Sequence, residues 1–404
     1  MRSQPRRHRS ARTDLRLGDM VARVAPDATP PEPVRPDFGG RCLTEVVPSL
    51  LAQVHGTGGR ARPDWLPEQV AGARQIVLLV LDGLGARQLD SRAAQLAPVL
   101  ASGTGTTLTS VAPSTTAAAL TSLATGLAPA VHGVVGYRVA IGDEILNVLG
   151  WRLGTRDARQ SVPPREFQPF TPFAPSPVPT PVVSRQDYRA TGFTAAHLGD
   201  APLHGWHTPA GLVVEVRRLL RRDAPFVYAY YDGIDRSAHA SGLGEHYDAE
   251  LVAVDRMVGD LLEVLPKDAA LVVTADHGQV EVGTSTEVLG GEVMACVSLL
   301  SGEGRFRWLH ARPGAKDRLL ELVAGLYSHI AWVRDVEQVV EEGWLGGSPT
   351  PEVRGRLGDV ALVPFASTAF LDPADTGEQR LICRHGSLTP DEMLVPLLAW
   401  APRR

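Results

Sequence analysis

Cysteine is scarce in this sequence. Its 404 residues include three cysteines, Cys42, Cys296 and Cys383, which lie far apart and form no Cys-x-x-Cys pair. An odd number of isolated cysteines builds neither a disulfide framework nor a zinc site held by thiolates. We therefore expect free thiols, and a buried one at Cys383, although that residue stands close to His385.

Long hydrophobic runs and a strong charge imbalance are also missing. No apolar run reaches the ~18 residues that a transmembrane helix needs, and the basic N-terminus lacks the apolar core of a secretory signal. The formal net charge of -5 gives no general attraction to nucleic acid or anionic membranes. These absences favour a cytoplasmic protein without nucleic-acid or membrane partners, and they leave the oligomeric state open.

Composition separates a tail from a folded part. The sequence is 44% hydrophobic and 21% charged, which is usual for a soluble globular protein. Residues 1–36 are basic and then proline-rich, which predicts a flexible arm. Within the folded part, 37–404, a proline-rich stretch at about 155–185 predicts an extended surface insertion, and about 280–380 a smaller, cap-like insertion.

Three apolar stretches share one pattern: "QIVLLVLDGLG", "PFVYAYYDGID" and "AALVVTADHGQ". Continuous apolar runs bounded by glycine or proline are typical of buried parallel strands, and helical patterns such as residues 251–265 supply the crossovers. We predict a doubly wound, mainly parallel sheet flanked by helices, an α/β fold. In such sheets ligands bind beyond the carboxyl ends of the strands. All three runs end there in acidic residues: Asp82, Asp232 with Asp235, and Asp276 beside His277.

Two of these sites pair a carboxylate with an imidazole. Asp235 and His239 are four residues apart, which places both on one face of a helical turn and suits a divalent metal such as zinc. A helix N-cap and a surface histidine explain the same pair. Asp276 and His277 converge only if the chain turns, which Gly278 allows; an Asx turn with a bystander histidine is the alternative.

Two further candidates lie in glycine-containing loops. Asp82 precedes Gly-Leu-Gly, which is either a turn or the start of a dinucleotide-binding loop, although Gln88 occupies the place of that loop's third glycine. His385 lies just before residues 389–392, "TPDE", where a capping box with proline at N1 predicts the start of a helix. A lone loop histidine is usually a surface residue.

Jointly these residues supply three carboxylates and three imidazoles, each at a predicted strand end or loop. That set suffices for two divalent metal ions with three protein ligands each, and two such ions suit an in-line displacement at phosphorus. The predicted metal ligands are Asp82, Asp235, His239, Asp276, His277 and His385.

Adjacent hydroxyls open another predicted helix. Ser114, Thr115 and Thr116 precede the stretch "AAALTSLATG", in which Gly126 is the expected C-cap. One of the three serves as the N-cap. A helix N-terminus also attracts phosphoryl oxygens, so a threonine there is placed to attack a phosphate.

Five motifs together make the sequence similar to the alkaline phosphatase superfamily, in particular to its type I phosphodiesterase/nucleotide pyrophosphatase branch. The motifs occur in the order of that family and span about residues 76–398: "VLLVLDGLG", "PSTTAAALTSLATGLAPAVHGVVGY", "DGIDRSAHASG", "VVTADHG" and "RHGSLTPDEMLVPLL". The resemblance implies an alkaline phosphatase-like catalytic domain over 37–404. By the family's spacing, the Thr-Gly and His-Gly pairs of the second motif point to Thr116 as the nucleophile, with Thr115 as the alternative.

The resemblance also implies how the ligands divide. One metal would be held by Asp235, His239 and His385, and the other by Asp82, Asp276, His277 and the hydroxyl of Thr116. Zinc is the expected metal, with manganese as the alternative. The implied reaction has two steps: Thr116 attacks phosphorus and releases an alcohol, and water then hydrolyses the phosphothreonine.

The sequence departs from this family at one contact. Ala119 stands where nucleotide pyrophosphatases carry an asparagine that binds a phosphate oxygen. No basic residue for a dianionic phosphate can be assigned either; Arg138 and Arg152 are candidates by proximity in sequence, and surface arginines are the alternative. A sulfatase is disfavoured, since no Cys-x-Pro-x-Arg motif is present.

The expected function is metal-dependent hydrolysis of a phosphodiester or nucleotide pyrophosphate bond in a small-molecule phosphoester. A phosphomonoesterase or phosphonate hydrolase of the same superfamily is the first alternative. A metal-binding scaffold without activity and a Rossmann-type nucleotide binder are the others. The remaining histidines match no ligand motif and are expected to be structural, packed or solvated: His132, His197, His204, His207, His246, His310 and His329.

Overall fold

The computed structural model describes residues 30–56, 62–375 and 377–401. The flexible arm predicted for 1–36 lies outside the described residues as far as residue 29. Residues 30–36 run along the folded protein, where the indole Nε1 of Trp332 donates to the carbonyl of Pro31 at 2.7 Å. The amide of Val34 donates to the carbonyl of Leu388 at 2.9 Å.

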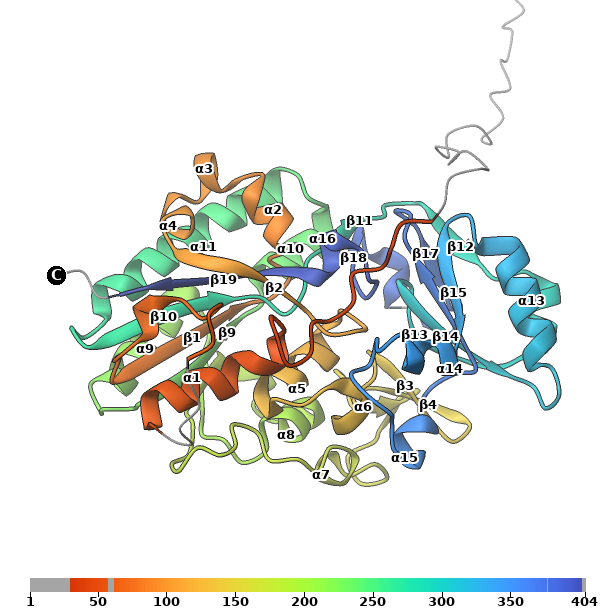
Figure 1. The fold of residues 1–404 in the computed structure, drawn as a ribbon, viewed down its shortest axis with the longest axis horizontal. Helices are drawn as coiled ribbons and strands as arrows, with labels where there is room; N and C mark the ends of the chain where they lie inside the picture. Colours follow the sequence, from red (N-terminus) through yellow and green to blue (C-terminus); the bar gives the residue numbers. More distant parts are fainter. Residues whose placement is uncertain (1–29, 57–61, 376, 402–404) are drawn as a thin grey trace, which may run out of the picture.

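A seven-stranded sheet forms the centre of the protein (Figure 1). Its strands are parallel except for β19, which runs antiparallel to both of its neighbours. In spatial order the strands are β2 (Thr104–Thr109), β19 (Leu394–Trp400), β10 (Ala269–Thr274), β1 (Gln75–Leu81), β9 (Phe226–Tyr231), β7 (Val182–Arg185) and β8 (Leu203–Trp206).

The three predicted apolar runs are the central strands β10, β1 and β9. Every residue of these strands is buried, because helices cover both faces of the sheet. In β1, Val80 pairs with Thr274 of β10 and Leu81 with Tyr231 of β9, so the three strands end at one edge. The predicted doubly wound α/β sheet is therefore confirmed.

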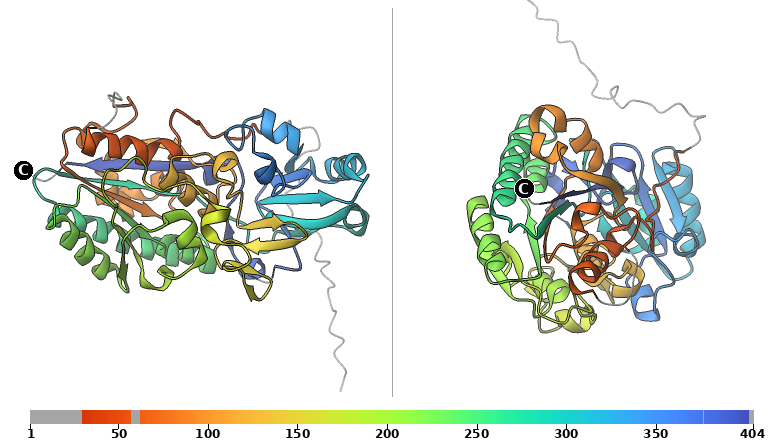
Figure 2. Two further views of the ribbon diagram at one scale, coloured as in Figure 1. Left: turned by 90° about the horizontal axis from the view of Figure 1, so that it is seen from below. Right: turned by 60° about the vertical axis from the view of Figure 1, so that its left-hand side comes forward.

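Helices flank the sheet on both sides (Figure 2). One layer contains α9 (Pro209–Leu220) and α11 (Glu245–Val264), which pack against each other. The opposite layer contains α1 (Val46–His55), α5 (Thr116–Thr125) and α8 (Gly192–Leu198). Within the described ranges, none of these or the other helices has the length and apolar character of a membrane span.

A smaller antiparallel sheet stands beyond the carboxyl ends of the central strands, at the right of Figure 1. It has its own apolar cluster, which includes Leu309, Val323 and Phe370. We refer to it, with its helix α13 (Lys316–Tyr327), as the cap. Its strands, in spatial order, are β13 (Val297–Glu303), β14 (Phe306–Ala311), β16 (Val360–Pro364) and β15 (Ala331–Asp335).

The proline-rich stretch is not extended throughout. It contains the short helix α7 (Pro164–Phe167), and its last residues form β7 of the central sheet. Its sequence offers three phenylalanines as apolar contacts to the rest of the protein; Phe167 and Phe173 are buried, whereas Phe170 is exposed.

Candidate metal centre and nucleophile

The carboxyl ends of β1 and β10 bring Asp82 and Asp276 together. Both follow directly on these strands, and the turn after Asp82 directs the amide of Gly83 to Asp276 Oδ1 at 3.1 Å. Gly83 has a φ of 74°, and a β-carbon there would lie 2.7 Å from the side-chain nitrogen of Gln279. Only glycine fits this close approach without a shift.

Asp82, Asp276 and His277 form the first cluster of candidate ligands. One ligand atom from each lies within 4.8 Å of the others, and all three residues are buried. His277 Nε2 is 3.4 Å from Asp82 Oδ1 and 3.5 Å from Asp276 Oδ2. The chain turns after Asp276, as the Asp-His-Gly sequence predicts, so the two adjacent side chains converge.

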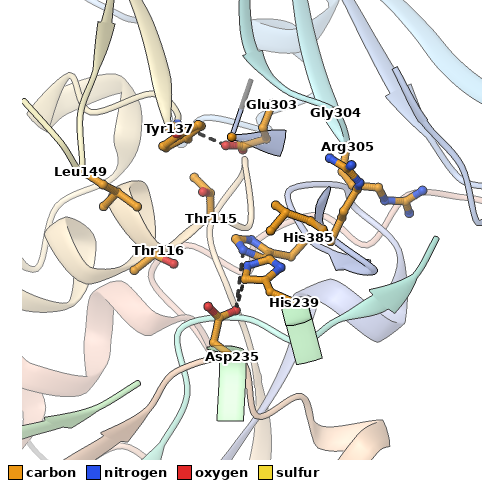
Figure 3. A pocket seen from close by; sticks show the side chains of 13 residues that line it. Thr115, Thr116, Tyr137, Leu149, Asp235, His239, Glu303, Gly304, Arg305 and His385 are labelled. Carbon is orange, nitrogen blue, oxygen red and sulfur yellow. Dashed lines mark hydrogen bonds and ion pairs between the residues drawn. The ribbon is translucent and has the colours of Figure 1, made fainter. Parts of the chain in front are cut away.

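Asp235, His239 and His385 form the second cluster, which meets the same 4.8 Å limit. Asp235 and His239 lie on one face of α10 (Gly233–Ser241), and His239 Nε2 is 3.2 Å from Asp235 Oδ1. His385 Nε2 is 3.9 Å from the same oxygen (Figure 3). His385 also stacks on His277, with ring centroids 3.5 Å apart, so the two clusters are adjacent.

All three histidines face their clusters with the same ring nitrogen, Nε2. Nδ1 donates to a backbone carbonyl in each: His239 to Cys383 at 2.7 Å, His277 to Gly278 and His385 to Ser114, both at 3.0 Å. Nδ1 is therefore protonated in each histidine, and Nε2 is the ring nitrogen that faces the carboxylates. Metal-binding histidines are oriented by such a hydrogen bond on the other ring nitrogen.

The buried carboxylates of the first cluster lack groups that would balance their charge. Asp82 Oδ1 and Asp276 Oδ2 are buried, and neither accepts a hydrogen bond from the described residues. Burial, then the charges of Asp276 and Asp235, hold the pKa of Asp82 well above its usual range, and burial raises the pKa of Asp276. Burial lowers the pKa of His385, with the charges of His277 and His239 acting in the same direction. Divalent cations would reverse these costs, so the residues present fit a pair of metal ions.

Thr116 adjoins the first cluster. It is the first residue of α5, and its hydroxyl oxygen lies 3.1 Å from His277 Nε2. Thr115 is the N-cap of α5 by its backbone, but its side chain accepts no capping hydrogen bond. Both threonines line the same cavity (Figure 3).

Two cavities meet at Thr116. The first, about 270 Å³, opens between the central sheet and the cap, and we refer to it as the mouth; it is lined by Thr115, Thr116, Tyr137, Asp235, His239, Glu303, Arg384 and His385, among others. The second, about 230 Å³, extends toward β9 and α8, and we refer to it as the side cavity; its lining includes Asp82, Thr116, Leu149, Ser184, Tyr188, Phe193, His197, Tyr228 and Tyr230. A group held at Thr116 would have space on two sides.

Two residues that support the clusters were not identified from the sequence. Tyr230 donates a short hydrogen bond to Asp82 Oδ2, and Gln279 donates to Asp235 Oδ1 at 2.5 Å. Tyr230 is on β9, where Tyr228 and Tyr230 point to one face by the alternation of a strand. Tyr230 could have been identified from this alternation, because it lies near the end of a strand that is directly followed by Asp232.

The arginine candidates do not line either cavity. Arg138 is buried and pairs with Asp372 at 2.6 Å, and Arg152 is exposed. His132 is buried in a structural role: Nδ1 accepts from the amide of Val134, and Nε2 lies 2.8 Å from the hydroxyl of Ser122.

The doubly wound sheet with a cap beyond its strand ends is the fold of the alkaline phosphatase superfamily. The sequence model of the family "Type I phosphodiesterase / nucleotide pyrophosphatase" matches residues 76–387. The chain belongs to this family and is thus a phosphoric ester hydrolase. No curated protein matches the sequence.

Solved structures share the fold at low sequence identity. Murine ectonucleotide pyrophosphatase/phosphodiesterase 5 is 14% identical, with a TM-score of 0.61 over 80% of this chain and 87% of that chain. The same values hold for an inactive threonine-to-alanine variant of it in complex with AMP. Phosphonoacetate hydrolase from Sinorhizobium meliloti 1021, in complex with phosphonoacetate, is 18% identical, with a TM-score of 0.59 over 81% of this chain and 90% of that chain.

Proposed function

We propose that this chain hydrolyses phosphodiester or nucleotide pyrophosphate bonds with two divalent metal ions and with Thr116 as the nucleophile. The observation that carries the proposal is the convergence of two three-residue ligand clusters beside the Thr116 hydroxyl. These residues come from segments far apart in the sequence, and their convergence has no evident structural purpose without cations.

The donor sets indicate which ions would bind. Asp235, His239 and His385 would hold one ion, and Asp82, Asp276 and His277, with Thr116, the other. Three imidazole nitrogens and three carboxylates suit zinc, and manganese is the alternative. Bound there, the ions would lower the pKa of the nucleophile and of water and neutralise charge on the phosphoryl oxygens.

The protein's own groups then account for the two steps. Thr116 Oγ forms a bond to phosphorus, the bond from phosphorus to the departing oxygen breaks, and the departing group leaves as an alcohol or a phosphate after taking a proton. Water then forms a bond to phosphorus, the bond from phosphorus to Thr116 Oγ breaks, the phosphoryl group leaves as a phosphate monoester, and Thr116 Oγ takes up a proton. The first backbone amides of α5 direct positive potential at the phosphoryl oxygens throughout.

A diester is favoured because cavities flank Thr116 on two sides. A phosphodiester carries an organic group on each side of phosphorus, and the mouth and the side cavity offer one space for each. The murine relative in complex with AMP is described as a nucleotide pyrophosphatase/phosphodiesterase, and its inactive form lacks a threonine. Both descriptions agree with this proposal.

A phosphomonoester or phosphonate substrate is the second candidate. Arg384 lines the mouth beside His385, and a guanidinium there favours a substrate with additional negative charge. Ala119, in place of an asparagine, removes one contact expected for a diester.

Rates on two chromogenic substrates separate these candidates. The wild-type protein loaded with zinc or manganese should hydrolyse bis-p-nitrophenyl phosphate faster than p-nitrophenyl phosphate. A higher rate on the monoester would contradict the diester assignment.

The nucleophile is tested by substitution. Thr116→Ala should abolish turnover and still bind metal, whereas Thr115→Ala should retain activity. Full activity of Thr116→Ala would show that the nucleophile is another residue.

A further inference from the structure

Glu392 is turned into the protein instead of closing a capping box. The sequence predicts that Thr389 and Glu392 cap α16 (Pro390–Met393) reciprocally, and the helix does begin at Pro390. The Thr389 side chain accepts no amide proton, however, and its hydroxyl donates to Glu392 Oε2 at 2.6 Å. The predicted capping box is therefore wrong, because other donors occupy the Glu392 carboxylate.

The principal donor is Arg305, which comes from the β13–β14 turn of the cap. Its Nε donates to Glu392 Oε1 at 3.0 Å and its Nη2 to Oε2 at 2.6 Å, a bidentate pair in which both side chains are completely buried. The Nη1 group of Arg305 donates to the carbonyls of Thr368, at 2.6 Å, and Ala366. Arg305 thus ties two segments of the cap to Glu392.

Glu392 in turn contacts two of the loops that carry candidate metal ligands. Its Oε1 accepts from the amide of Ser387, two residues after His385, at 3.0 Å. Its backbone carbonyl accepts from the amide of Gly278, which follows His277, at 2.9 Å. The two loops are therefore held by opposite ends of the same residue.

The contacts continue to the nucleophile loop. The Ser114 hydroxyl donates to the carbonyl of Ser387 at 2.7 Å, and the carbonyl of Ser114 accepts from His385 Nδ1 at 3.0 Å. Ser114 stands two residues before Thr116. A shift of Ser387 would therefore be felt at His385 and at Thr116 together.

A fully buried ion pair is a weak source of stability, because the loss of hydration offsets most of its attraction, and apolar residues of similar size often replace such pairs without cost. Stability alone therefore does not explain why Arg305 and Glu392 are charged. Their contacts with the loops of His385 and His277 offer a functional reason. We infer that Arg305 and Glu392 are positioning residues that set His385 and His277 at metal-binding distance and couple both to the cap. This inference rests on the two metal sites of the proposed function.

The decisive variant is Arg305→Met/Glu392→Leu, which replaces the pair by apolar side chains and removes the acceptor for Ser387. Zinc affinity would be measured by competition with a chromophoric chelator, and folding by the thermal midpoint of the metal-free protein. We expect a folded protein whose zinc affinity is lower by at least ~10-fold, the usual effect of removing support behind metal ligands. With bis-p-nitrophenyl phosphate, kcat should fall more than KM rises.

Arg305→Lys serves if the double variant does not fold. Lysine keeps the charge but cannot form two parallel hydrogen bonds, so zinc affinity and kcat should both fall below those of the wild type. The matched control is Glu342→Gln, which weakens the cap pair Arg334–Glu342 (2.5 Å) and should change neither zinc affinity nor kcat.

Two results overturn the inference in distinguishable ways. A folded double variant, or Arg305→Lys in its place, that keeps wild-type zinc affinity and kcat refutes the positioning role and leaves the proposed function intact. A wild-type protein that binds neither zinc nor manganese refutes the proposed function, and the positioning role with it.

Discussion

At the scale of single residues, two tyrosines on the same face of β9 have opposite surroundings. Tyr230 donates to the carboxylate of Asp82, whereas the hydroxyl of Tyr228, also buried, has no hydrogen-bond partner among the described residues. A buried hydroxyl without a partner costs stability, and one that serves a charged acceptor adds it. Tyr228 lines the side cavity, where a bound organic group could reach its hydroxyl.

The first prediction compares Tyr228→Phe with Tyr230→Phe. Tyr228→Phe should leave the free energy of unfolding unchanged or raise it by up to ~1 kcal/mol, while Tyr230→Phe should lower it by ~1–3 kcal/mol. Urea unfolding of both metal-free variants gives the comparison. Equal losses in the two variants would mean that the Tyr228 hydroxyl has a partner in solution.

The second prediction concerns His132. Burial, together with the charge of Arg356, lowers the pKa of His132 to about 3, whereas an unfolded histidine titrates near ~6.5. Because the unfolded state binds the proton more readily, the stability contributed by neutral His132 is complete above pH ~6.5 and is lost as the pH falls toward 3.

His132→Asn removes this titration and can keep the acceptor for the Val134 amide. The wild-type protein should therefore lose more unfolding free energy than the variant between pH 7 and pH 4.5, by up to ~1.4 kcal/mol per pH unit. Chelator-treated samples unfolded by urea at each pH test this. Parallel curves for the two proteins would show that the pKa of His132 is not lowered in the folded protein.

At the scale of elements, the turn between β1 and α2 (Ala86–Asp90) requires glycine at position 83. Gly83 combines a positive φ with crowding, since an added β-carbon would lie 2.7 Å from Gln279 and 3.0 Å from Asp235. Gly72 has nearly the same φ, 73°, but open space around it. Comparing the two positions therefore separates the cost of the positive φ from the cost of the close contacts around an added β-carbon.

The third prediction uses this pair. Gly72→Ala should cost ~1 kcal/mol of unfolding free energy for its backbone conformation alone. Gly83→Ala should cost more and should also weaken zinc binding, because Asp235 and Gln279 must move. Thermal midpoints and chelator competition measure both effects. Similar thermal midpoints and zinc affinities for the two variants would show that the turn accommodates the β-carbon without moving the candidate ligands.

Elements with strong local patterns were the ones that the sequence predicted. The runs of β1, β9 and β10 are continuously apolar, and the i, i+4 spacing of Asp235 and His239 places both on α10. β2, "TGTTLT", is half exposed and carries no such run, and β7 lies at the end of the proline-rich stretch. Neither was predicted, because their strand conformation comes from their neighbours in the sheet.

At the scale of the whole molecule, the sequence predicted which side chains supply the candidate clusters but not what surrounds them. Ligand types and strand ends are local features. The contact between Arg305 and Glu392 joins residues 87 positions apart. No local pattern marks Arg305, and the local pattern around Glu392 predicted a different role, that of a capping residue. The position of β19 between β2 and β10 is likewise set by pairings across the chain.

The fourth prediction concerns removal of metal from the intact protein. Without cations, Asp82 and Asp276 have pKa values raised above those of the unfolded chain, so the folded state holds their protons more tightly and loses stability as the pH rises. A chelator should therefore lower the thermal midpoint more at pH 8 than at pH 5.5, with recovery on adding zinc. A midpoint that does not respond to chelator at either pH would argue against structural coupling to metal.

The interior position of β19 in the sheet affects how the protein folds during its synthesis. β2 emerges from the ribosome early, yet its ladder partner is β19, residues 394–400. During most of translation, β2 and the outer edge of β10 therefore lack that partner. Unpaired strand edges of this kind favour association between nascent chains. A chain that ends between residues 385 and 394 would lack β19, so β2 would not join β10, and His385 would lie in an unanchored terminal segment instead of beside Asp235.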